Sequence, residues 1–264
     1  MQDIASIISA VRAQRPLVHN ITNYVVMNFS ANALLAFGAS PAMVHAPEEV
    51  EDFVAISSSL VVNIGTLDSR WVESMKLAAA KASALKKPWV LDPVGVGATR
   101  FRLATSQALL ALKPAIVRGN AAEIITLAGA SGGASKGVDS LAASSEAIGA
   151  ARALARSSGA VVVATGENDI ATDGERVFSI AGGSAQMTLV TGTGCCLSAT
   201  VAATAAVASD PLSAAVAACA VYKVAAERAA SEANAPGSLA VAFLDALHEF
   251  QPDDYARLAR IETL

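Results

Sequence analysis

Residues 89–118, WVLDPVGVGATRFRLATSQALLALKPAIVR, contain two short apolar runs on either side of a segment with helical character. The runs are residues 89–92 and 115–118. Similar runs occur at residues 42–44, 60–64 and 161–165, and helical segments again lie between them. Near-continuous apolar strands that alternate with helices are typical of a parallel sheet covered by helices on both faces. The sequence therefore predicts an α/β fold with a mainly parallel central sheet.

Polar side chains stand at or near the ends of four of these predicted strands, at Asn63, Asp92, Arg118 and Thr165. The carboxyl ends of parallel strands meet at one edge of a sheet, and α/β folds bind their ligands there. We therefore expect these four side chains to lie along a common edge.

The regular alternation changes after residue 165. Residues 170–172 and 176–178 flank Asp173-Gly174, a pair typical of a type I′ turn, so an antiparallel hairpin is expected at one edge of the sheet. Residues 129–137 are rich in Gly, Ala and Ser and are interpreted as a solvated connecting loop rather than as a flap over a ligand. No internal repeat or linker is found, which favours a single domain over residues 1–264.

Composition limits the classes of function. The 264 residues are 53% hydrophobic with a net charge of −4, and no run of Lys or Arg stands out, so no nucleic-acid partner is expected. The three cysteines suggest neither a disulfide framework nor a metal-ligand pair, which favours a reducing compartment, the cytoplasm. The N-terminus lacks the pattern of a signal peptide. The apolar helical regions at residues 197–208 and 212–221 are too short to cross a bilayer, so no membrane partner is expected.

Residues 189–197, LVTGTGCCL, predict a tight glycine turn that leads into a long apolar helix. Gly192 and Gly194 allow close backbone approach to a ligand, and the first N–H groups of a helix favour an anion. Cys195 then falls in the first helical turn, where the pKa of a thiol can be lowered. Taken alone, the stretch is equally compatible with a plain turn followed by a buried cysteine.

Two common nucleotide-binding motifs are absent. There is no GxxxxGK[ST] loop, and residues 95–100 end in Arg where a dinucleotide fingerprint needs Gly. What remains is Asp92, the sequence RGNAAE at residues 118–123, Thr165-Gly166 and the glycine turn. Carboxylates for Mg²⁺, a cation for phosphates and backbone amides around the transferred group are the parts that phosphoryl transfer requires.

Six motifs occur in an order that resembles the hydroxyethylthiazole kinase family of the ribokinase-like superfamily, from the N-terminal helix to about Phe250. They are PLVHNITN at residues 16–23, PAM at 41–43, LDPVG at 91–95, RGN with Glu123 at 118–123, ATGE at 164–167 and TGTGC at 191–195. The resemblance implies ATP-dependent phosphorylation of the hydroxyl of 4-methyl-5-(2-hydroxyethyl)thiazole in thiamine salvage. It also implies a three-layer ribokinase-like fold and a homotrimer with active sites between subunits.

The resemblance implies a role for several positions that match the family motifs. Met43 and Gly192 would contact the thiazole, with Asn23 as a further candidate on the substrate side. Arg118 and Thr165 would contact ATP. Glu123 would help to hold Mg²⁺ through water, with Asp92 as a second acidic contributor.

Cys195 matches the position where most ribokinase-like sugar kinases carry an aspartate as general base. A thiol accepts a proton only when it is ionised, and a thiolate close to ATP phosphates would suffer repulsion. Our hypothesis is that Cys195 orients the substrate hydroxyl and assists proton removal modestly, while Gly192, Thr193 and Gly194 supply most of the transition-state stabilisation. Cys196 is interpreted as a packing residue.

Simpler interpretations remain for several of these residues. Met43 is also suited to a core, residues 20–23 are also suited to capping a helix that begins near Tyr24, and His19 and His45 are interpreted as structural or substrate-edge residues. Three other functions stay open: a kinase of another vitamin precursor such as hydroxymethylpyrimidine, a ribokinase-like dehydratase of hydrated nicotinamide nucleotides, and a nucleotide-binding scaffold. Cys195 in place of aspartate counts against the first two.

Overall fold

The computed structural model describes residues 2–130 and 140–264, and their strands form one nine-stranded sheet in the order β2-β1-β3-β4-β5-β6-β7-β8-β9. The strands are β1 (Leu17–Ile21), β2 (Ser40–Met43), β3 (Ser59–Asn63), β4 (Trp89–Asp92), β5 (Ile116–Asn120), β6 (Val161–Thr165), β7 (Asp169–Thr172), β8 (Val177–Ala181) and β9 (Arg260–Thr263). All pairings from β2 to β6 are parallel, and those from β6 to β9 are antiparallel. The predicted α/β class, with a mainly parallel sheet and an antiparallel edge, is confirmed.

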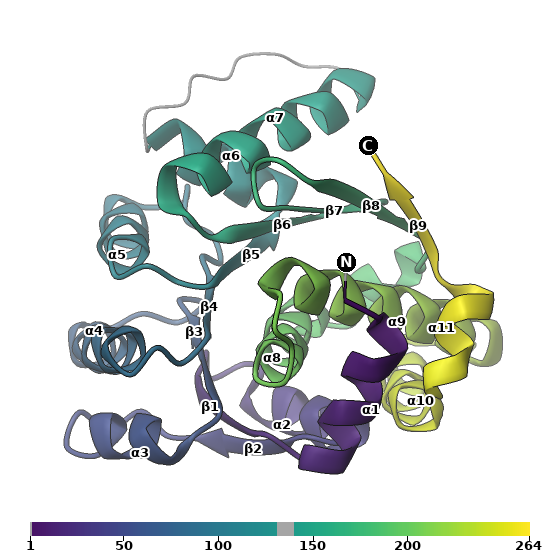
Figure 1. Cartoon of the computed structure of the whole chain (residues 1–264), viewed down its shortest axis with the longest axis horizontal. Helices are drawn as coiled ribbons and strands as arrows, with labels where there is room; N and C mark the ends of the chain where they lie inside the picture. The colour runs from purple at the N-terminus through teal and green to yellow at the C-terminus, as the bar shows by residue number, and fades with distance from the viewer. Residues whose placement is uncertain (1, 131–139) are drawn as a thin grey trace.

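Helices cover both faces of the sheet and complete three layers (Figure 1). One face carries α1 (Ile4–Gln14), α2 (Met27–Phe37), α8 (Thr193–Ala205), α9 (Pro211–Glu232), α10 (Pro236–Glu249) and α11 (Pro252–Leu258). The other carries α3 (Val50–Ile56), α4 (Ser69–Ala84), α5 (Arg100–Leu110), α6 (Ala121–Ala130) and α7 (Ser140–Ser158). Successive strand residues point to opposite faces, so in β3 Val61 joins one apolar core while Leu60 and Val62 join the other. This two-sided burial is the reason for the near-continuous apolar runs in the sequence.

The expectation that residues 20–23 cap a helix at Tyr24 is wrong. Asn20 lies in β1, and α2 begins only at Met27, where the N-cap Val26 offers no side-chain bond. The strand was missed because its side chains include polar ones that bond locally. The Nδ2 group of Asn20 donates to the carbonyl of Val18 at 2.8 Å.

The predicted hairpin is confirmed, but its type I′ turn is wrong. Thr172 pairs with Val177, which leaves four residues in the connection, and only Gly174 of these has a positive φ, at 96°. A type I′ turn needs two such residues. Instead, Asp173 Oδ1 accepts hydrogen bonds from the backbone N–H groups of residues 175 and 176 at 3.0 and 2.8 Å. This side-chain bonding is typical of an Asx-type turn.

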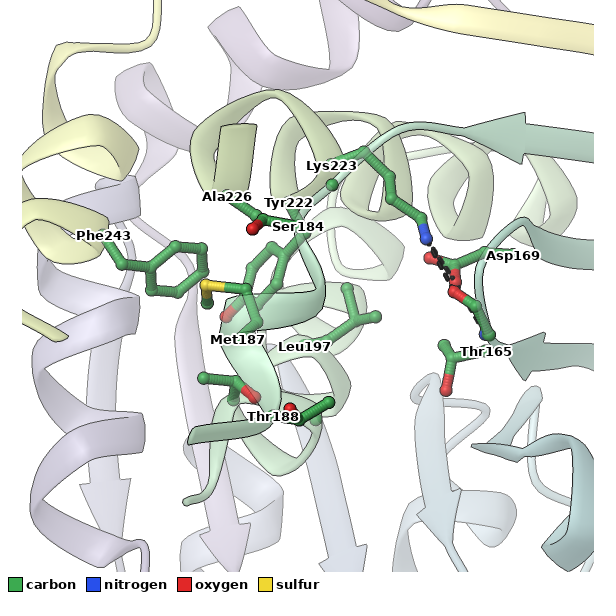
Figure 2. A pocket seen from close by; sticks show the side chains of 14 residues that line it. Thr165, Asp169, Ser184, Met187, Thr188, Leu197, Tyr222, Lys223, Ala226 and Phe243 are labelled. Atoms are coloured by element: carbon green, nitrogen blue, oxygen red, sulfur yellow. Dashed lines mark hydrogen bonds and ion pairs between the residues drawn. The ribbon is translucent and has the colours of Figure 1, made fainter. Parts of the chain in front are cut away.

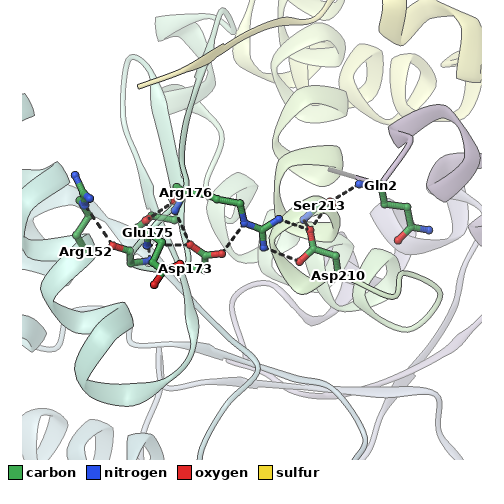
Figure 3. Close-up of polar contacts among 9 residues, drawn as sticks. Gln2, Arg152, Asp173, Glu175, Arg176, Asp210 and Ser213 are labelled. Atoms are coloured by element: carbon green, nitrogen blue, oxygen red, sulfur yellow. Dashed lines mark hydrogen bonds and ion pairs between the residues drawn. The ribbon is translucent and has the colours of Figure 1, made fainter.

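The hairpin tip is tied to the helical layer through Arg176 (Figure 3). Its guanidinium forms ion pairs with Asp173 at 2.7 Å and with Asp210 at 3.0 Å. Asp210 is also the N-cap of α9, where it accepts a hydrogen bond from Ser213 N at 3.3 Å. One carboxylate therefore both caps a helix and anchors the edge of the sheet.

Of the predicted helical segment at residues 197–208, residues 197–205 belong to α8, which ends at Ala205, and residues 206–208 lie outside the helix. The segment at residues 212–221 is helical, as expected, and belongs to α9. Within residues 2–130 and 140–264, no helix combines the length and the apolar character needed to cross a bilayer. The predicted loop at residues 129–137 begins inside α6, since that helix runs to Ala130. Residues 131–137 of this loop lie outside the described residues.

Candidate functional site

The glycine turn leads directly into α8, as the sequence predicted. Gly192 is the N-cap with φ of 88°, and a Cβ atom there would lie 2.6 Å from Val26 Cγ1. The position therefore needs glycine for its conformation and for the space beside it. Thr193, Gly194 and Cys195 form the first turn of the helix, whose N–H groups carry the positive end of the helix dipole.

The four polar side chains expected along one edge are brought together by direct contacts. Asn63 Nδ2 donates to Asp92 Oδ2 at 2.7 Å, and the Arg118 guanidinium lies 3.8 Å from the same oxygen. Arg118 in turn donates to Thr165 Oγ1 at 2.7 Å. Asn63, Asp92 and Thr165 are the last residues of β3, β4 and β6, and Arg118 lies near the end of β5. These four strands are adjacent and parallel, so the predicted edge is confirmed.

Asp92 is a fully buried carboxylate at the centre of this row. Its Oδ2 also accepts a hydrogen bond from Ser198 Oγ at 2.7 Å, whereas Oδ1 has no partner within the part of the chain that the structure describes. Burial raises the pKa of Asp92 to about 6, against the lowering effect of the Arg118 charge and the bond from Ser198. A buried carboxylate oxygen without a partner is costly unless a ligand or ion completes it.

Arg118 connects the row to the start of α8. Its side chain is 9% exposed, and a Cβ atom at Gly194 would lie 2.9 Å from both terminal guanidinium nitrogens. Burial alone would lower the pKa of Arg118, but the neighbouring charges, that of Asp92 first, raise it. Gly194 therefore lets a permanent cation lie against the N-terminus of a helix, where both favour the same anion.

Cys195 lies beside Asn23, next to the Asn63 end of the row, but its thiol does not have the low pKa that its helical position suggested. Asn23 Nδ2 donates to Cys195 Sγ at 3.5 Å and to Asn63 Oδ1 at 2.9 Å. Burial and the nearby Asp92 charge raise the pKa of Cys195 to about 11, and these effects outweigh the bonds from Asn63 and Asn23. The expectation of a lowered thiol pKa is wrong because desolvation, the largest contribution, raises it. Cys196 is fully buried, as its packing interpretation requires.

Glu123 and Asn120 form a capping box at the start of α6. Glu123 Oε2 accepts from Asn120 N, and Asn120 Oδ1 accepts from Glu123 N, both at 2.8 Å. The other oxygen, Oε1, accepts from Gly95 N at 2.8 Å. Within residues 2–130 and 140–264, no group of three or more His, Cys, Asp and Glu side chains could hold a metal ion. The residues fit a divalent cation held by few protein ligands, since Asp92 Oδ1 is free to contribute while Glu123 is already engaged by amides.

Met43 is the last residue of β2, partly exposed, and pairs in register with Asn20 of β1. A cavity of about 240 Å³ lies beyond this end of the sheet and is lined in part by Tyr24, His45 and Trp71. The rings of Tyr24 and Trp71 are 4.3 Å apart between centroids. His19 is instead a core residue, and burial lowers its pKa to about 4.

A second cavity, of about 300 Å³, opens beside the start of α8 (Figure 2). Its polar end is formed by Thr165, Gly166, Thr193 and Gly194, and its apolar wall includes Met187, Leu197, Tyr222 and Phe243. Met187 belongs to the short 3-10 helix η1 (Ala185–Leu189). This cavity therefore lies between Thr165, at one end of the row of strand ends, the N-terminus of α8 and an apolar wall. Asn63, Asp92 and Arg118 are not among its lining residues.

Three residues that contact this site were not found from the sequence. Ser198, which bonds Asp92, lies three residues after Cys195 in α8, so helical spacing could have placed both on one face. Asp169 and Lys223 form an ion pair of 3.1 Å at the cavity wall (Figure 2). They are 54 positions apart in the sequence, and no local pattern indicates their contact.

Comparison with known proteins gives the family. The model of the hydroxyethylthiazole kinase family matches residues 8–253. A hydroxyethylthiazole kinase of Nitratidesulfovibrio vulgaris (strain DP4) is 52% identical over 242 residues, which are 91% of this chain and 90% of that protein. The structure of the hydroxyethylthiazole kinase protein from Pyrococcus horikoshii OT3 is 42% identical, with a TM-score of 0.93 and 100% of both chains covered.

More distant structures define the wider fold. A ribokinase-like superfamily protein from Enterococcus faecalis V583 has a TM-score of 0.68 at 13% identity, over 94% of this chain and 95% of that one. The predicted ribokinase-like architecture is thereby confirmed. On the family match, the relatives and the shared fold together, the chain belongs to the hydroxyethylthiazole kinase family.

Proposed function

We propose that this protein transfers the γ-phosphoryl group of ATP to the hydroxyl of 4-methyl-5-(2-hydroxyethyl)thiazole and so produces the thiazole phosphate used in thiamine salvage. The observation that carries the proposal is the continuous row Asn63, Asp92, Arg118 and Thr165, which ends at the N-terminus of α8. Membership in the hydroxyethylthiazole kinase family supports the choice of substrate. The row provides what phosphoryl transfer needs, namely a cation, a carboxylate and helix amides around one point.

ATP occupies the cavity of about 300 Å³ in this proposal. Arg118 and Thr165 bind its phosphates, and the amides of Gly192, Thr193 and Gly194 surround the group in transfer. The apolar wall is suited to the purine ring, because aromatic and aliphatic side chains favour a flat, weakly polar surface. Charge that develops on the transferred group is then met by a guanidinium and a helix N-terminus that need no rearrangement.

The thiazole binds on the other side of Cys195, against Met43, Gly192 and Asn23. Asn23 is 5% exposed and its amide already bonds the thiol, so it can hold the substrate hydroxyl beside Cys195. With a pKa of about 11, the thiol is neutral at physiological pH. Cys195 therefore orients the hydroxyl rather than removing its proton as a strong base.

Asp92 and Glu123 are the acidic residues proposed to hold Mg²⁺, which neutralises phosphate charge when bound. Asp92 Oδ1 is the oxygen available for direct contact, and Glu123 contributes through water. Asn63 and Ser198 keep the second oxygen of Asp92 occupied and thereby fix the orientation of the first.

The proposed assembly is a homotrimer of single-domain chains in the cytoplasm, with the thiazole site between subunits. Two apolar side chains next to Asn23 support a subunit contact there, since Tyr24 and Val25 are 63% and 64% exposed. All three cysteines of the chain are free thiols, which supports a reducing compartment.

The proposal is tested by following ADP release from Mg-ATP with and without 4-methyl-5-(2-hydroxyethyl)thiazole, with the product identified by mass. Thiazole-dependent ADP and a thiazole monophosphate are expected. Stimulation by hydroxymethylpyrimidine instead would identify another vitamin kinase. ATP binding without turnover in the presence of any of these alcohols would favour the scaffold function, and repair of hydrated nicotinamide nucleotide would favour the dehydratase.

A further inference from the structure

Lys223 is a nearly buried cation on α9 that faces the turn between β6 and β7. Its side chain is 12% exposed. The ammonium group donates to the carbonyl oxygens of Gly166 and Glu167, each at 2.8 Å, and lies 3.1 Å from Asp169 Oδ1. An ammonium group has three N–H donors, so all of them have protein acceptors within reach.

The turn that Lys223 holds has few other restraints. Residues 166, 167 and 168 are exposed, and the first of them is a glycine, which is conformationally permissive. The N–H of Gly166 donates to Asp169 Oδ1 at 3.1 Å, the same oxygen that Lys223 approaches. Asp169 thus fixes the donor side of the turn while Lys223 fixes its carbonyls.

Lys223 is itself held from the opposite side. A Cβ atom at Gly183, whose φ is 83°, would lie 3.0 Å from Lys223 Cδ. A side chain at this position would be strained by the positive φ and would crowd the aliphatic stem, which passes between the β8–η1 connection and the turn. The ammonium is therefore directed at the turn by packing as well as by hydrogen bonds.

We propose that Lys223 is a positioning residue of the nucleotide site, which fixes the turn at residues 166–168 so that Thr165 and Gly166 form the wall of the cavity beside α8. Both of these residues line the cavity together with Lys223 and Asp169. Thr165 is also the side chain that receives the Arg118 hydrogen bond, so movement of the turn would misplace the phosphate-binding cation. The inference rests on the proposed function only in taking this cavity as the nucleotide site.

The expected effect on nucleotide binding is specific. Lys223→Met releases two carbonyls and leaves the buried Asp169 carboxylate unpaired next to the cavity. We expect the Kd of ADP and the KM of ATP to rise about tenfold, as loss of a bond to a charged group implies. The KM of the thiazole should stay within about twofold, since its site lies beyond Cys195.

Conservative variants separate positioning from direct charge contact with phosphates. Lys223→Gln keeps a donor that can reach one carbonyl, so it should bind ADP more tightly than Lys223→Met. Equal loss in both variants would overturn the positioning role in favour of a direct charge contact. The double variant Lys223→Met/Asp169→Asn also removes the unpaired carboxylate, so it can replace the single variant in the binding assay if Lys223→Met does not fold. We expect it to lose the same nucleotide affinity. Lys76→Met, at an exposed position of α4, is the matched control.

Hydrogen exchange of the unliganded protein gives a readout that needs no activity. Residues 164–170 should exchange faster in Lys223→Met than in the wild type, while the strands of the parallel half keep their protection. Unchanged exchange in this segment, or an ADP Kd within twofold of wild type in a folded Lys223→Met protein, would overturn the inference. If the wild type binds ADP but does not phosphorylate the thiazole, the proposed substrate is wrong, whereas the inference about Lys223 is not contradicted.

Discussion

Replacement of Cys195 by serine tests whether the thiol is a base or an orienting group. The pKa of the thiol is raised to about 11, chiefly by burial and next by the charge of Asp92. At pH 7 only about one thiol in 10,000 is then ionised, and forming the thiolate costs about 5 kcal/mol, from four pKa units at about 1.36 kcal/mol each. A serine hydroxyl can accept the bond that Asn23 donates. We therefore expect Cys195→Ser to keep kcat within about tenfold of the wild type.

The assay is thiazole-dependent ADP release at saturating Mg-ATP, measured from pH 6.5 to 9 for the wild type, Cys195→Ser and Cys195→Ala. If the neutral thiol only orients the hydroxyl, log kcat should be nearly flat between pH 7 and 9 in all three proteins. A base with a pKa near 11 would instead give a tenfold rise in kcat per pH unit in the wild type that disappears in both variants. That slope, or complete loss of activity in both the Ser and the Ala variant, would refute the reasoning. Cys196→Ser, at the buried neighbour, controls for damage to α8.

Three further changes have outcomes set by the structure. Gly194→Ala places a methyl group 2.9 Å from the Arg118 guanidinium, so kcat/KM for ATP should fall by about tenfold or more. Thermal stability should change little because alanine favours a helix, and unaltered ATP kinetics would contradict the prediction. Asp92→Asn should abolish activity. Because burial raises the Asp92 pKa from 3.8 to about 6, the wild type loses stability as pH rises through that range. Urea unfolding in EDTA should therefore favour the variant by about 2 kcal/mol more at pH 7 than at pH 4, and a pH-independent difference would disprove it. Asp210→Ala removes both the α9 cap and the Arg176 ion pair, whereas Asp210→Asn removes the ion pair but keeps the cap. Denaturant unfolding should show the Ala variant to be about 1 kcal/mol less stable than the Asn variant, and equal stabilities would exclude a contribution of the cap.

Much of the site could be predicted because its residues follow strands. Asp92 and Arg118 come at the ends of apolar runs, and in a parallel sheet all such ends face the same edge. The glycine turn before Cys195 was equally readable, since its conformation and the helix that follows are local properties. Two predictions were wrong because local side-chain bonding competed with the expected pattern. Near the site, β1 was interpreted as a helix cap; at the hairpin tip, the Asp173 side chain formed a longer turn than the Asp-Gly pair suggested.

The sequence by itself determined the alternation of strands and helices from β2 to β8, the edge at which the polar side chains gather and the helix end that faces them, because hydrophobic periodicity and turn chemistry act over a few residues. Only the tertiary structure decided the properties that depend on what surrounds a group. The pKa of Cys195 is high because packing partly buries the thiol next to Asp92, although its helical position alone favours a low value. Lys223 meets the turn after Thr165 only because α9 lies against β6 and β7. Desolvation and long-range contact are created by folding, and no local pattern contains them.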